Sequence, residues 1–165
     1  MAALIQGVLS HLATILFVVA IAVAALRHDG RPFAARLLDW LLLLSVGGGG
    51  VWAGTFHIFA PQIAAASIGW QVSPFQFEVG VADLASGLVA IAAFWRSLPF
   101  KCAVVAYISL FFLGVTVGHV RDAMNAGNFA ANNFGLLLLV TVLQMVGLPW
   151  LAWRTWRDER SRAGA

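Results

Sequence analysis

The chain has 165 residues, of which 61% are hydrophobic and only 10% are charged, and its mean hydropathy is +0.89. A water-soluble domain carries roughly a quarter charged residues, so this composition excludes an ordinary soluble protein and indicates a lipid bilayer as the surrounding medium. The net charge of +3 does not indicate nucleic-acid binding, because nine of the ten Lys and Arg residues flank apolar runs instead of forming one basic stripe.

Five apolar runs are each long enough to cross a bilayer core of about 30 Å. They are Leu4–Leu26, Leu37–Ala60, Phe75–Trp95, Cys102–Ala123 and Phe134–Trp153. The first run lacks a basic flank and a cleavage site, so we expect it to be retained as a helix and not removed as a signal peptide. We therefore predict an all-α fold, a polytopic membrane helix bundle with about five transmembrane helices that forms a single domain over residues 1–165.

Glycine and proline mark helix ends and helix contacts in these runs. Pro61 is expected to end the second run, and Pro99 lies in the turn between the third and the fourth. Ser73-Pro74-Phe75-Gln76 predicts a capping box at the start of the third run, with Ser73 as the N-cap. The four glycines of Gly47–Gly50 lie inside the second run, where they predict close helix packing or a local kink and not a phosphate loop.

The basic residues predict the orientation of the bundle. Nine of them lie in the first connection, in the third connection or after the fifth run, and only Arg121 lies on the other side. Cytoplasmic loops of membrane proteins are enriched in Lys and Arg. With an odd number of spans, this distribution predicts an N-terminus outside and a C-terminus in the cytoplasm.

Ionisable residues within the runs gather near the predicted outer face. They are His11, His57, Glu78, Asp83, His119 and Asp122, and an asparagine-rich connection follows the fourth run. The inner half contains Asp39, which we explain by pairing with Arg36, and His28 in a loop. Charged groups inside a membrane are costly, so they normally face the bundle interior, pair with one another or serve a function.

Helical spacing assigns several of these residues to shared faces. Gly50, Gly54 and His57 lie on one face of the second run, where the glycines would let a neighbouring helix approach closely. A similar small and polar stripe on the third run consists of Gln76, Gly80, Asp83 and Gly87. Glu78 points away from that stripe, whereas His119 and Asp122 share a face of the fourth run.

The histidines and carboxylates near the outer face predict a transition-metal site. Imidazole and carboxylate ligands suit zinc, iron, manganese or copper, and the lack of usable thiolates argues against an iron–sulfur cluster. We expect His57, His119 and Glu78 to be the ligands. Further ligands, or partners that orient a ligating histidine, are expected among His11, Asp83 and Asp122. A b-type haem between His57 and His119 is less favoured, because both lie near helix ends and a haem needs a deep apolar slot.

Three functions fit this pattern. The first is metal-dependent or redox chemistry at the outer membrane face. The second is an accessory subunit of a larger membrane complex, or a homo-oligomer, in which the polar cluster is only structural. The third is a small solute or proton transporter, which is less favoured because the polar residues do not continue to the cytoplasmic side. The sequence assigns no catalytic residue, substrate or reaction.

Two segments carry a resemblance to a known family. The first is Ser73-Pro74-Phe75-Gln76-Phe77-Glu78-Val79-Gly80 with Ala82-Asp83-Leu84, and the second is Gly118-His119 with Asp122 before the asparagine-rich connection. From about Trp52 to Gly135 the sequence resembles a family of small uncharacterised bacterial integral membrane proteins. The resemblance implies a small helical bundle in the bacterial cytoplasmic (inner) membrane. It implies no activity and transfers no catalytic residue.

Overall fold

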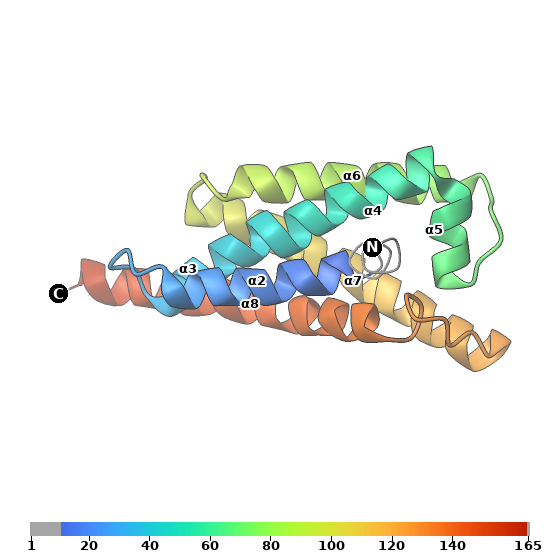
Figure 1. Ribbon diagram of the computed structural model, residues 1–165. Helices are drawn as coiled ribbons and strands as arrows, with labels where there is room; N and C mark the ends of the chain where they lie inside the picture. The colour runs from blue at the N-terminus through green and yellow to red at the C-terminus, as the bar shows by residue number, and fades with distance from the viewer. Residues whose placement is uncertain (1–10, 165) are drawn as a thin grey trace.

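The computed structural model describes residues 11–164, and these residues form a bundle of helices that contains no strand (Figure 1). In chain order the helices are α2 (Leu12–Leu26), α3 (Phe33–Trp40), η1 (Leu41–Gly48), α4 (Gly49–Phe59), α5 (Pro61–Ile68), α6 (Phe75–Ala93), α7 (Leu98–Ala126) and α8 (Leu136–Ala163). The segments α3, η1 and α4 form one continuous helix, of which η1 is π-helical. The all-α prediction is confirmed.

Among the described residues, four helical segments are long and apolar enough to cross a membrane. They are Phe33–Phe59, Phe75–Ala93, Leu98–Ala126 and Leu136–Arg162. Helix α2 is apolar as well, but it has 15 residues, whereas about 20 are needed to span a bilayer core. The predicted first span starts at Leu4, so its first seven residues lie outside the described part of the chain. By helix length and hydropathy the chain is a multi-pass membrane protein, and a fifth span at the N-terminus stays a prediction.

Proline sets the boundaries of several helices. Helix α4 ends at Phe59, and Pro61 opens α5, a short helix that the sequence did not predict. Pro99 lies in the first turn of α7, where its missing N–H is tolerated. Helix α7 therefore begins before Pro99, at Leu98, and not at the predicted Cys102.

The capping box predicted at Ser73 is wrong. Helix α6 has Pro74 as its N-cap, and no side-chain capping bond is formed there. The buried side chain of Gln76 instead donates from Nε2 to the carbonyl oxygen of Pro61 at 2.8 Å. Gln76 lies on the inward-facing side of α6, so its amide satisfies a partly buried carbonyl of the preceding helix and joins α5 to α6.

Glycines bring the backbones of α4 and α6 into contact. A Cβ added at Gly54 would lie 2.6 Å from both the carbonyl oxygen of Gly80 and the amide nitrogen of Leu84. A Cβ added at Gly87 would lie 2.6 Å from the amide nitrogen of Val51. No side chain fits at such distances, so only glycine permits this helix spacing. The two predicted glycine stripes are confirmed as a packing interface.

The first glycines of the Gly47–Gly50 run lie at the end of the π-helical stretch. Regular α-helical geometry resumes at Gly49. A Cβ added at Gly47 would lie 2.6 Å from the Ile91 side chain of α6, so the predicted close packing is confirmed at this position. A π turn closes with i→i+5 hydrogen bonds and so contains more residues than an α turn.

The apolar core lies between the continuous helix, α7 and α8. Leu38, Leu42, Ile108 and Leu148 are almost completely buried in it. Helix α3 packs against α2 and α8, and η1 packs against α2 and α6. Helix α7 packs mainly on α8. The bundle is thus held together around its central helix.

The bundle has two chemically different ends. The α2–α3 and α6–α7 connections and the last turns of α8 lie at the left of Figure 1, whereas α5 and the α7–α8 connection lie at the right. We call the first the basic end, since it contains Arg27, Arg31, Arg36, Arg96, Lys101, Arg154, Arg157, Arg160 and Arg162. We call the second the histidine end, since it contains His57, His119 and the asparagine-rich connection.

Candidate functional site

A hydrogen-bonded network occupies the histidine end, and His119 is one of its centres. The ring of His119, on α7, donates from Nδ1 to Oδ1 of Asn133 at 2.5 Å. The amide nitrogen of Asn133 donates to the backbone oxygen of Asn128 at 2.7 Å, which fixes the orientation of the amide and therefore the tautomer of the histidine. The ring of Trp70 stacks on His119 with 5.8 Å between the centroids. Asn133 is completely buried and His119 is half-buried, so water reaches this contact only from the histidine side.

Asp122 is the second centre of the same network. Its Oδ2 accepts hydrogen bonds from Trp70 Nε1 at 3.0 Å and from Asn128 Nδ2 at 2.7 Å. Asn128 also donates to the carbonyl oxygen of Ile68, the last residue of α5, at 2.9 Å. The network therefore connects α5 and Trp70 to the end of α7 and to the α7–α8 connection.

Gly69 allows this junction to form. Its φ of 78° lies in the left-handed region, which glycine adopts without strain. A Cβ at this position would also lie 2.6 Å from Oδ1 of Asn128. The same glycine thus ends α5 and leaves room for the asparagine that holds α5 in place.

The other predicted ligands are not part of this network. His57 is buried on α4 against Gly80 of α6, and its Nδ1 has no hydrogen-bond partner among residues 11–164. Glu78 is exposed and Asp83 is half-buried on α6, and His11 is exposed at the start of α2. Among the six, the structure brings together only His119 and Asp122, through their shared contacts with Trp70.

A metal centre is not apparent in this arrangement. Within residues 11–164, no three His, Cys, Asp or Glu side chains come together as a group that could hold a metal ion. The His119 ring is instead bonded to an asparagine, and the Asp122 carboxylate to an indole and an amide. The predicted site with His57, His119 and Glu78 therefore stays a prediction, and the geometry of the described residues does not favour it.

The basic end contains a buried ion cluster around Asp39. The side chain of Asp39 is only 4% exposed and pairs with Nζ of Lys101, whose side chain is 10% exposed. A second pair joins Asp39 to Arg31 at 2.6 Å. A buried carboxylate needs such partners to offset its loss of hydration.

Arg36 is not the partner of Asp39, so that explanation is corrected. The guanidinium of Arg36 donates to the backbone oxygens of Ala24 at 3.1 Å and of Arg31 at 2.6 Å. It thereby satisfies one carbonyl in the last turn of α2 and one in the α2–α3 connection, while Asp39 contacts Lys101 of α7. Sequence reasoning missed Lys101 because it was counted only as a topology marker. Pro99 could have indicated that Lys101 belongs to α7. Proline is common in the first turn of a helix, so Lys101, two residues later, lies inside that helix.

An exposed ion pair continues the cluster outside the membrane-spanning segments. Arg31 contacts Asp29 at 2.7 Å, and the hydrogen bond from Arg31 lowers the pKa of Asp29 below its ordinary 3.8. The same carboxylates, Asp29 first and then Asp39, raise the pKa of Arg31. The α2–α3 connection is therefore attached to the bundle by Arg31, which bridges two acidic residues.

Of three comparisons with known proteins, one gives a match. No curated protein and no solved structure matches this chain. A family of unknown function, DUF6790, matches residues 8–161, which is a longer stretch than the resemblance seen between Trp52 and Gly135. The chain belongs to this family.

Proposed function

We propose that this chain is an accessory, multi-pass subunit of a larger complex in the bacterial cytoplasmic membrane. The observation that carries the proposal is the network at the histidine end. Its ionisable members, His119 and Asp122, bond to residues of the same chain that hold α5 and the α7–α8 connection in place. Reactive groups of an active site are instead left open toward a substrate.

The sidedness that we propose puts the basic end in the cytoplasm and the histidine end on the outer face. The distribution of Lys and Arg supports it. Exposed tryptophans accompany the charges on α8, where Arg157 lies over the Trp153 ring and Arg160 over the Trp156 ring, 5.0 and 4.2 Å from the ring centroids. Tryptophan and arginine side by side are typical of a membrane–water boundary.

An open face of α7 supports a subunit role. Gly114 and Gly118 lie four residues apart on this helix, and a Cβ added at either would meet no atom of residues 11–164 within 4 Å. Leu110 and Val117 on the same face are 70% and 58% exposed. Small residues at this spacing let transmembrane helices pack closely. The glycines of α4 and α6 face each other and already form a helix contact within the chain. Gly114 and Gly118 face no helix of the described chain, so they can receive a transmembrane helix of a partner protein.

Photo-crosslinking in the native membrane tests this proposal. A photoreactive residue placed at Val117 should give one discrete product with a different membrane protein. The same residue at Val146, which is 62% exposed on α8, serves as the control and should give none. Replacing Gly114 and Gly118 by leucine should abolish the product at Val117.

Two results would overturn the proposal. The absence of a product at Val117 would mean that lipid alone covers this face. A product with twice the mass of the chain would replace the larger complex by a homo-oligomer.

Metal binding is the second candidate, and one observation favours it. When Nδ1 of the neutral His119 ring donates to Asn133, the lone pair lies on Nε2, which is the arrangement found in metal-ligating histidines. Elemental analysis of the detergent-purified protein tests this candidate, with a visible spectrum to test for haem. Bound zinc, iron, manganese or copper should be lost in His57→Ala and in His119→Ala, and stoichiometric metal that survives both changes would reject these ligands.

A further inference from the structure

A cavity of about 280 Å³ opens at the basic end of the bundle. Its wall is formed by the α2–α3 connection, α3, the residues that lead into α7 with the first turn of that helix, and the last turns of α8. The charged side chains that line it are Arg31, Arg96, Lys101, Arg162, Asp39 and Glu159. Four positive charges against two negative charges make this cavity electropositive, and a phosphate group with its four oxygens fits in it.

Two of these positive charges are not neutralised within the described chain. Asp39 is shared by Lys101 and Arg31. The side chains of Arg96 and Arg162 are exposed and form no ion pair or hydrogen bond with another residue between 11 and 164. Arginine presents several N–H donors in a planar fork, which matches the oxygens of a phosphate.

The start of α7 adds to the positive potential of the cavity. Ser97 and Leu98 line it, and the side chain of Ser97, the N-cap residue, forms no capping hydrogen bond with α7. The first N–H groups of a helix lack intrahelical partners, and the dipole of the helix makes this end positive. The N-terminus of α7, a helix of 29 residues, therefore lies at the same cavity that Arg96 and Arg162 line.

We propose that this cavity binds the phosphate of an anionic ligand, with Arg96 and Arg162 as its main contacts. The ligand that the position favours is an anionic lipid head group, because the cavity lies at the ends of membrane-spanning helices, where basic pockets meet the cytoplasmic leaflet. A soluble phosphate compound would use the same contacts. The choice of a lipid head group rests on the sidedness proposed above, but the proposal goes beyond the subunit role and does not depend on that role.

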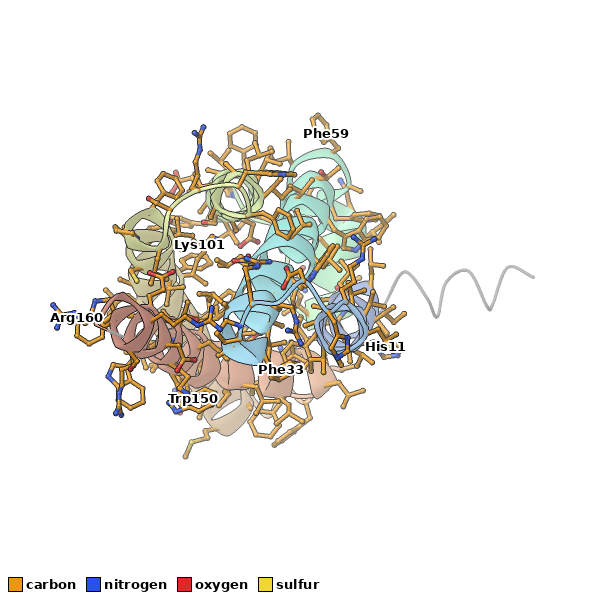
Figure 2. All side chains as sticks on the ribbon, turned by 90° about the vertical axis from the view of Figure 1, so that its left-hand side faces the viewer. His11, Phe33, Phe59, Lys101, Trp150 and Arg160 are labelled. Atoms are coloured by element: carbon orange, nitrogen blue, oxygen red, sulfur yellow. The ribbon has the colours of Figure 1, made fainter. Side chains whose placement is uncertain are left out.

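Figure 2 looks onto the basic end and supplies a matched control. Lys101 lies within the ring of helices, whereas Arg160 points outward from α8. Arg157 and Arg160 are stacked on tryptophans and do not line the cavity. The double change Arg157→Gln and Arg160→Gln removes as much positive charge as the double change Arg96→Gln and Arg162→Gln. The charge that the control removes lies outside the cavity.

The experiment measures lipid binding to the purified full chain in an uncharged detergent, from the shift of the melting temperature. Phosphatidylglycerol should raise the melting temperature, and phosphatidylcholine should raise it much less. Losing two charge-assisted contacts should weaken phosphatidylglycerol binding by at least about tenfold in the Arg96→Gln, Arg162→Gln protein. The Arg157→Gln, Arg160→Gln protein should bind nearly as the unchanged chain does.

The outcomes separate the two sources of the phosphate and also test the site itself. If inorganic phosphate has no effect at millimolar concentration, the ligand is the lipid head group. If it competes with phosphatidylglycerol in the unchanged protein only, the site is confirmed and its natural ligand is a soluble phosphate. Equal losses in both double variants, or no preference for phosphatidylglycerol over phosphatidylcholine, would overturn the proposal.

Discussion

Replacing Gly54 by alanine tests the backbone contact on which the packing of α4 against α6 depends. The added Cβ would lie 2.6 Å from two backbone atoms of α6, the oxygen of Gly80 and the nitrogen of Leu84. Backbone atoms cannot rotate away, so the two helices must separate. Overpacking of this kind costs about 1–3 kcal/mol, and the rigid contact favours the upper value.

The intrinsic helix preference of alanine acts in the opposite direction. Alanine is favoured over glycine inside a helix by about 1 kcal/mol. The net loss that we expect for Gly54→Ala is therefore about 2 kcal/mol, which lowers the ratio of folded to unfolded protein by roughly thirtyfold.

Equilibrium unfolding in mixed micelles, followed by circular dichroism, measures this loss. Gly147→Ala is the matched control, because Gly147 also lies inside a spanning helix and a Cβ added there meets no atom of the described part of the chain within 4 Å. The control should be as stable as the unchanged protein or slightly more stable. A Gly54→Ala protein that is no less stable than the Gly147→Ala protein would refute the close approach of α4 and α6.

Three further predictions concern the polar clusters. Asp39→Asn leaves the buried Lys101 without its carboxylate and should lower the unfolding free energy by about 3–5 kcal/mol; a loss below 1 kcal/mol in the same unfolding assay would contradict the buried pair. Asn133→Ala removes the partner of His119 and should cost about 1–3 kcal/mol, together with faster amide exchange in the α7–α8 connection; unchanged exchange would argue against the network. The lowered pKa of Asp29 means that its pairing with Arg31 stabilises the fold above pH 3.8 and is lost as the pH falls below that value. Carbon-13 NMR titration checks this, and a midpoint at or above 3.8 would contradict the pairing.

The spanning helices could be predicted because their indicators are local. Long apolar runs bounded by proline or charge give α6, α7 and most of the Phe33–Phe59 helix within a few residues. The glycine spacing on two runs also gave the α4–α6 interface, since a face without side chains is visible from periodicity alone.

The site could be predicted only in part, because partners far apart in sequence are not visible in a single chain. The spacing of His119 and Asp122 placed them on one face, but nothing indicated that Trp70 would contact both. Likewise, Asp39 was paired with its neighbour Arg36, although Lys101, 62 residues away, is its partner. The short helix α5 was missed for a different reason, since its eight residues are too few to show a helical period.

The π-helical stretch Leu41–Gly48 determines which way the two halves of the central helix face. Asp39 and His57 are 18 residues apart, which in an uninterrupted α-helix is about five full turns of 3.6 residues and would align them on one side. The wider turns of the π stretch break this alignment, so that Asp39 meets α7 while His57 meets α6. Deleting one residue between 41 and 48 would restore the α register, and either the acidic residue or the glycine face would then be rotated away from its neighbour.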